Sequence, residues 1–132
     1  MGSEMTSHDN RRVAPPRRLS FAELDLVRAL LAPIQRFSEP LQCQIEYARV
    51  VEECATCHSV TIAVEEGACG AIPTNIRVVA TGDSRDRDGA EMSVLLHQRG
   101  GYLVSLEVIR ADGAEPKGLP SATSVSVTPG LT

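Results

Sequence analysis

The sequence has few aromatic side chains. Its 132 residues include two phenylalanines, two tyrosines and no tryptophan. We therefore expect a core built from Val, Leu, Ile and Ala. Platforms that bind single-stranded nucleic acid depend on aromatic faces for base stacking, and a net charge of −4 disfavours contact with phosphate backbones. The composition thus predicts no nucleic-acid partner.

Long apolar runs are also missing. No stretch approaches the roughly 20 consecutive apolar residues of a membrane span, and residues 1–20 contain no apolar segment typical of a secretory signal. We therefore expect no membrane association and a cytoplasmic location. In that compartment cysteines remain thiols or bind metals more often than they form disulfides.

Motifs of the common enzyme classes are absent. There is no Gly-x-Ser-x-Gly elbow, P-loop, Rossmann glycine pattern or His-Glu-x-x-His. An enzyme that uses His97 and Glu107 in a pocket on a sheet face is one reading, but a histidine on an apolar strand is more often a core or edge residue. The sequence therefore predicts a non-enzymatic protein.

The N-terminal segment differs in composition from the rest. Residues 1–18 are polar and charged and contain Pro15 and Pro16, so we expect a disordered arm, followed by a single domain over residues 19–132. A helix is predicted to begin at Ser20, because Ser20 and Glu23 have the spacing of a capping box. Pro33 is expected to end or kink this helix.

Beyond residue 44 the hydrophobic period changes from helical to alternating. Ser38 to Pro40 is expected to break the helical region. Alternating or β-branched residues predict strands over 44–53, 59–64, 76–80, 91–98, 103–110 and 123–127. The predicted fold class is α+β, with an N-terminal helix packed on an antiparallel sheet of about five strands.

A hairpin is the clearest structural signal. Gly100 and Gly101 separate two apolar runs and can adopt the positive φ angles of a tight turn. With these glycines as the central residues, His97 faces Val104 and Leu95 faces Leu106. The face expected to enter the core then carries Leu95, His97, Val104, Leu106 and Val108.

Cys54-Ala55-Thr56-Cys57-His58 fits the Cys-x-x-Cys-His pattern of covalent haem attachment. We expect no haem, because no export signal is present and the motif runs into a strand. A thioredoxin-like redox pair is disfavoured for the second reason, since that pair lies at a helix N-terminus.

Zinc is the metal that this region fits best. Cys54, Cys57 and His58, with Cys43 and Cys69, supply enough soft ligands for a tetrahedral site. The second pair is not a Cys-x-x-Cys unit, however, and buried cysteines commonly act as small hydrophobic residues. Both readings stay open. A calcium site at Asp83, Asp86 and Asp88 is disfavoured, because EF-hand spacing is missing and arginines interleave with the acids.

Several short motifs follow one another along the chain. After the capped helix come Cys54 and Cys57 before Ser-Val-Thr-Ile, an Asp-Gly turn at 88–89, and Gly-x-Leu-x-x-Leu-Glu-Val over 101–108. In this order the chain resembles a family of small uncharacterised bacterial proteins that carry clustered cysteines before a strand. The resemblance covers residues 19–128 and implies the fold predicted above, without catalytic residues. The organisation is also similar to that of immunity proteins, which bind and block a cognate toxin.

These observations favour a non-enzymatic cytoplasmic protein-binding module of the immunity or antitoxin type, whose acidic charge suits a basic toxin. The alternative is a small zinc-binding domain centred on Cys54, Cys57 and His58. A homodimer is compatible with either function.

Overall fold

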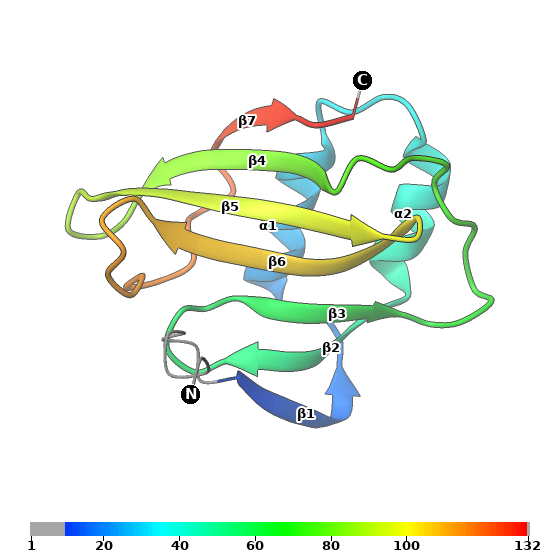
Figure 1. The fold of residues 1–132 in the computed structure, drawn as a ribbon, viewed down its shortest axis with the longest axis horizontal. Helices are drawn as coiled ribbons and strands as arrows, with labels where there is room; N and C mark the ends of the chain where they lie inside the picture. The colour runs from blue at the N-terminus through cyan, green and yellow to red at the C-terminus, as the bar shows by residue number, and fades with distance from the viewer. Residues whose placement is uncertain (1–9, 132) are drawn as a thin grey trace.

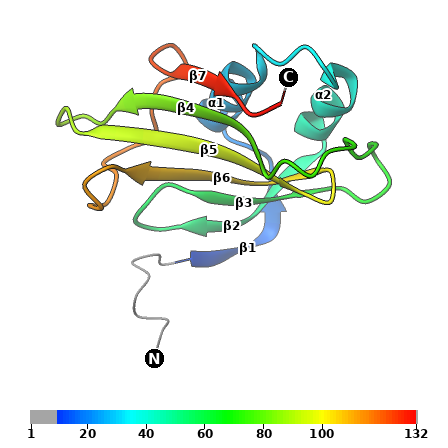
Figure 2. The same ribbon diagram turned by 45° about the horizontal axis from the view of Figure 1, so that its top comes forward.

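A computed structural model describes residues 10–131 of the chain. It contains two helices and one antiparallel sheet of seven strands in the order β1-β2-β3-β6-β5-β4-β7. Both helices lie behind the sheet in Figure 1, and the turned view in Figure 2 shows them on the same side. The predicted helix-and-sheet class is confirmed, but the sheet has seven strands where about five were expected. The elements are β1 Asn10–Arg17, α1 Phe21–Leu31, α2 Ser38–Glu46, β2 Ala48–Cys54, β3 Val60–Val64, β4 Val78–Arg85, β5 Glu91–Arg99, β6 Tyr102–Arg110 and β7 Ser126–Pro129.

The predicted capping box begins α1. The Ser20 hydroxyl accepts a hydrogen bond from the Glu23 amide at 3.1 Å, and the Glu23 carboxylate accepts one from the Ser20 amide at 2.8 Å. Two of the unpaired amides at the helix start are thereby satisfied. The helix ends at Leu31, two residues before Pro33, as the sequence predicted.

The expected disordered arm is wrong for the residues that the structure describes. Asn10–Arg17 is strand β1, which pairs with β2 at the sheet edge, while residues 1–9 lie outside the described part of the chain. Prolines are tolerated there, because an edge strand leaves one side of its backbone unpaired. Arg17 at the end of this strand forms an ion pair with Glu23 of α1, in which the arginine Nη1 lies 2.9 Å from the glutamate Oε1.

Helix α2 replaces the predicted break and the first residues of the predicted 44–53 strand. Leu41, Gln44 and Ile45 are its buried residues, and they have helical rather than alternating spacing. Pro40 lies in the first turn, where a missing amide removes no intrahelical bond. Strand β2 therefore begins at Ala48.

The β5–β6 hairpin has a different register from the predicted one. Gly100 and Gly101 form the turn with φ angles of +61° and +92°, as expected. His97, however, pairs with Ser105, so Val104 is an extra residue in a β-bulge. A one-residue shift moves every side chain beyond it to the other face of the sheet. The expected pairing of His97 with Val104 is wrong.

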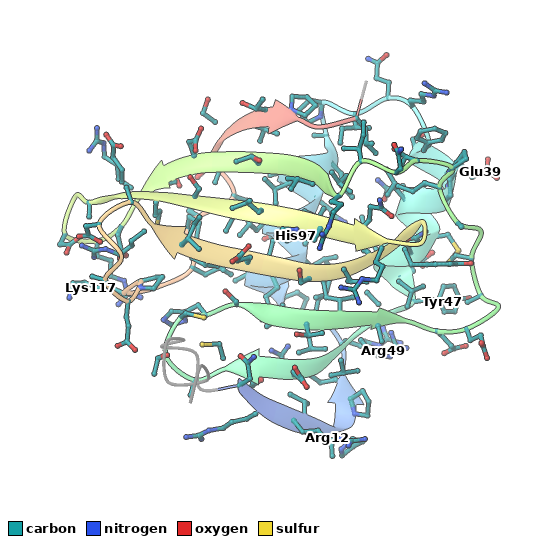
Figure 3. The ribbon with its side chains drawn as sticks, viewed as in Figure 1. Arg12, Glu39, Tyr47, Arg49, His97 and Lys117 are labelled. Atoms are coloured by element: carbon teal, nitrogen blue, oxygen red, sulfur yellow. A yellow bond between two sulfur atoms is a disulfide. The ribbon has the colours of Figure 1, made fainter. Side chains whose placement is uncertain are left out.

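The bulge decides which side chains enter the core. The face toward the helices takes the buried residues of both strands, which are Met92, Val94, Leu96, Leu103, Leu106 and Val108. Leu95, His97 and Glu107 lie on the opposite face, and Figure 3 shows His97 on β5 away from the helices. The predicted core face therefore mixed residues from the two sides of the sheet.

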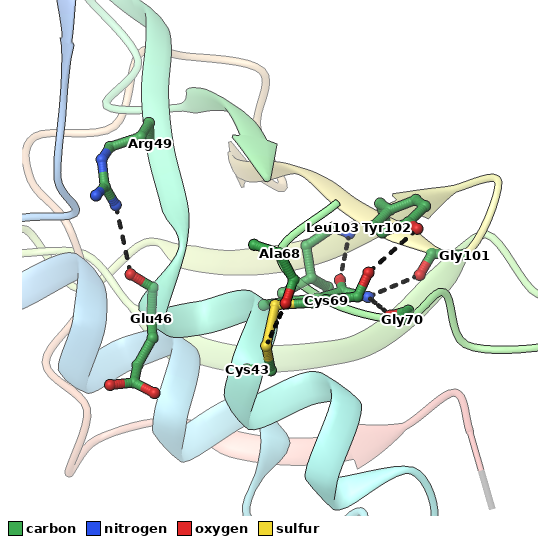
Figure 4. The surroundings of a disulfide bond; sticks show 10 residues. Cys43, Glu46, Arg49, Ala68, Cys69, Gly70, Gly101, Tyr102 and Leu103 are labelled. Atoms are coloured by element: carbon green, nitrogen blue, oxygen red, sulfur yellow. Dashed lines mark hydrogen bonds between the residues drawn. A yellow bond between two sulfur atoms is a disulfide. The ribbon is translucent and has the colours of Figure 1, made fainter. Parts of the chain in front are cut away.

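Two buried glutamines satisfy the backbone around this turn. Gln44 is fully buried; its amide nitrogen donates to the carbonyls of Gly70 and Gly101 at 2.9 Å each, and its oxygen accepts from the Leu103 amide at 3.0 Å. Gln98 accepts from the Gly101 amide at 2.8 Å. Figure 4 shows the bonds from α2 to Gly70, Gly101 and Leu103. The two glutamine side chains thus supply hydrogen-bond partners to backbone groups that the β5–β6 pairing leaves unpaired where the register shifts.

Candidate functional site

The sheet face opposite the helices is the main open surface of the described chain. Along β5, buried Val94 and Leu96 alternate with half-buried Ser93, Leu95 and His97. Cross-strand partners share a face, so the residues paired with these three mark the same surface. No helix or strand of residues 10–131 covers it in Figure 1. We call it the open face, and it includes Thr81, Asp83, Ser93, Leu95, His97, Ser105, Glu107 and Ile109.

His97 and Glu107 meet on the open face. The His97 Nε2 lies 2.9 Å from Glu107 Oε1, and the two side chains are 23% and 38% exposed. The predicted core face contained His97 but not Glu107, and the bulge at Val104 brings the two side chains to the same face. The pair borders a hollow of about 320 Å³ that Arg77 and Arg99 also line.

A carboxylate that holds an imidazole can serve proton transfer. Catalysis also requires a nucleophile and donors for the developing charge within reach. In the part of the chain that the structure describes, the hydrogen bond of the His97 ring is to Glu107. This arrangement fixes a polar anchor on the surface.

A second, larger hollow lies at the other end of the open face. It measures about 750 Å³, and Asp83, Glu91, Ser93 and Ile109 are among its lining residues. The Ser93 hydroxyl donates to the Asp83 carboxylate at 2.8 Å, which holds that acid in place. Ile109 is 41% exposed. Two carboxylates, Asp83 and Glu91, thus line the hollow beside an exposed apolar side chain.

The predicted zinc ligands are not brought together as a set. Cys43 on α2 and Cys69 form a disulfide, shown in Figure 4, so the expectation of thiols or metal ligands is wrong for these two. Within residues 10–131, no group of three or more His, Cys, Asp or Glu residues is placed to hold a metal ion. A disulfide persists in oxidising compartments and is reduced in a typical cytoplasm. The Cys43–Cys69 disulfide therefore does not support the expected cytoplasmic location, which stays a prediction.

Cys54 and Cys57 do lie together, in the loop between β2 and β3. The Cys57 amide donates to the Cys54 sulfur at 3.1 Å, and the Cys54 amide closes the loop by donating to the Ser59 carbonyl at 2.9 Å. His58, the third predicted ligand, is exposed and has a φ of +65°, in the left-handed region. Burial is the main cause that raises the pKa of Cys57, and the neighbouring Cys54 thiol raises it further.

The acidic turn before β5 binds an arginine that sequence reasoning missed. Arg110 lies 3.0 Å from Asp86, 2.9 Å from Asp88 and 2.6 Å from Asp112. Its hydrogen bonds are the main cause that lowers the pKa of Asp112 to about 2. The ion pairs with these acids come from Arg110 on β6, whereas the sequence suggested the neighbouring Arg85 and Arg87. No calcium role follows from this cluster.

No helix within residues 10–131 is long and apolar enough to cross a membrane. No protein-family model, curated protein or solved structure matches the chain.

Proposed function

We propose that the protein is a non-enzymatic protein-binding module that docks a basic partner on its open face. The observation that carries the proposal is the pair of Asp83 and Glu91 that line a hollow of about 750 Å³ together with exposed Ile109. An apolar centre with a charged rim is the usual anatomy of a protein interface. The charge of the rim selects a partner rich in arginine or lysine.

The electrostatic balance of this surface supports a basic partner. Arg85 also lines the hollow and keeps its positive charge while it donates to the Gly89 carbonyl at 3.0 Å, so the lining holds two carboxylates, Asp83 and Glu91, and one guanidinium. The chain as a whole carries a net charge of −4. Complementary charge accelerates encounter between partners and disfavours wrong ones. A toxin-neutralising immunity protein is the form of this function that the resemblance favours.

Covalent capture in the producing cell identifies the partner. A photoreactive residue is placed at Ser93 on the open face, and at Gln42 on the exposed side of α2 as the control. We expect a basic protein to be captured from position 93 and not from position 42. Equal capture from both positions, or capture from 42 alone, contradicts docking on the open face.

Charge-neutral variants then test the mechanism with the purified partner. Asp83→Asn combined with Glu91→Gln removes two charges from the open face, and Glu39→Gln with Glu46→Gln removes two from exposed α2 positions. We expect the first pair to slow association about tenfold at low ionic strength and the control pair to leave it nearly unchanged. Equal effects of the two pairs would show that only net charge matters.

A further inference from the structure

The Cys54–Cys57 loop is a chemical feature that the proposed function does not use. Its two thiols are not joined in a disulfide, whereas Cys43 and Cys69 are. The loop also differs from the helix N-terminus at which redox pairs are usually found.

The two sulfurs have different surroundings. The Cys54 sulfur accepts the Cys57 amide at 3.1 Å and lies 3.5 Å from the Thr56 hydroxyl. Both groups can donate to a thiolate at Cys54, and donors to the charged form favour that form. Burial and the hydrogen bond with Cys54 act on Cys57 in the opposite direction and keep it protonated.

Access to the two sulfurs differs as well. Cys54 lines a hollow of about 290 Å³ together with Arg17, His58 and Leu119, and Cys57 is not among its lining residues. Cys54 is 7% exposed and Cys57 is 4% exposed. A reagent that enters from solvent through this hollow therefore meets Cys54 first, more slowly than it would meet an exposed thiol.

We propose that Cys54 and Cys57 are a redox-active dithiol, in which Cys54 attacks and Cys57 resolves. With a small-molecule disulfide as the oxidant, the Cys54 thiolate attacks one sulfur of the oxidant and releases one small thiol, which leaves a mixed disulfide. The Cys57 sulfur, after losing its proton, attacks Cys54 and displaces the second small thiol. The protein gives up two electrons and two protons, and the oxidant becomes two thiols.

The loop geometry allows the second step without a large movement. The Cys57 amide donates to the Cys54 sulfur at 3.1 Å, so the backbone of the resolving residue already lies against the sulfur that it would attack. The short Cys-x-x-Cys spacing and the closed hairpin loop hold the two residues there, with the Cys54 amide bonded to the Ser59 carbonyl at 2.9 Å. Intramolecular capture is therefore faster than attack by a second small thiol.

The test treats the folded protein with oxidised glutathione and identifies the products by differential alkylation and mass spectrometry. In the natural sequence we expect a Cys54–Cys57 disulfide, with the mass lower by two hydrogen atoms. Cys57→Ser is expected to accumulate a glutathione adduct on Cys54, and Cys54→Ser to react at Cys57 at least about tenfold more slowly. Far-ultraviolet circular dichroism checks that each variant is folded.

A measurement without any substitution keeps the proposal falsifiable if a variant fails to fold. Limited alkylation of the reduced, folded natural protein should label Cys54 before Cys57. Preferential labelling of Cys57, or protein that keeps both thiols after exposure to oxidised glutathione, overturns the proposal. Protection of both thiols that a chelator removes would instead indicate a bound metal and would also overturn it.

Discussion

Gln44 provides the most specific prediction about the fold. We consider Gln44→Leu, which keeps a side chain of similar size but removes both polar groups. Gln44 is fully buried and makes three hydrogen bonds to the backbone, of 2.9, 2.9 and 3.0 Å. They connect α2 to the segment around Gly70 and to the bulged start of β6.

The three lost bonds do not contribute equally. The Leu103 amide is buried and has the Gln44 oxygen as its acceptor, so it loses its partner. The Gly101 carbonyl keeps a hydrogen bond from the Ile72 amide at 2.9 Å. The bond to Gly70 is only partly buried, so water can replace it. A buried group left unsatisfied costs about 1–3 kcal/mol, so we expect a total of about 2–4 kcal/mol.

Urea and thermal unfolding followed by circular dichroism measure this loss. For a chain of this length, about 2–4 kcal/mol corresponds to a decrease in Tm of about 7–14 °C. Gln42→Leu is the matched control, because Gln42 lies on the exposed side of the same helix. Reducing agents are left out so that the Cys43–Cys69 disulfide stays intact in every sample. The control should change the free energy of unfolding by less than about 0.5 kcal/mol.

One result would refute the reasoning. If Gln44→Leu is as stable as Gln42→Leu, the buried amide bonds do not fix the hairpin register. A Gln44→Leu variant that is more stable than the natural sequence would show the same, since apolar packing would then outweigh the polar network.

Three other predictions concern the covalent and ionic contacts. Cys43→Ser with Cys69→Ser, which opens a link between residues 26 positions apart, should lower the free energy of unfolding by about 3–4 kcal/mol in urea titrations; no change would show that the bond does not constrain the unfolded chain. Arg110→Met should lower Tm more than Arg85→Met, because it leaves three carboxylates without their shared partner; equal decreases would contradict this role. Because Arg110 holds the pKa of Asp112 at about 2, below the ordinary 3.8, the stability from this contact is present above about pH 4 and is lost as pH falls toward 2. An Asp112→Asn variant should therefore lose less Tm over that pH range than the natural protein, and parallel curves would contradict the assignment.

Local signals in the sequence predicted local structure well. The capping box at Ser20 and Glu23 gave the correct start of α1, because its two bonds join residues only three positions apart. The glycine turn of the β5–β6 hairpin was also correct for this reason. Strand β1 was missed, because its pairing with β2 joins Asn10 to Cys54, and its prolines and arginines taken alone indicate disorder.

The candidate site could not be predicted from alternation alone. One extra residue at Val104 changes which side chains of β6 lie on the same face as a given side chain of β5. No turn motif in the sequence predicts that bulge. One reading of the sequence named His97 and Glu107 together, but the predicted register could not show that their side chains meet. The cysteines show the same limit, since their spacing does not say that Cys43 pairs with Cys69 while Cys54 lies beside Cys57.

The central claim is that a basic partner binds the open face, and amide chemical-shift mapping tests it most directly. The isotope-labelled protein is titrated with the partner captured from position 93, and shifts are followed across the sheet and both helices. We predict the largest changes on β4, β5 and β6, around Asp83, Ser93 and Ile109, with little change at exposed positions of α1 and α2. Changes concentrated on the helices, with β4 to β6 unaffected, would contradict the account.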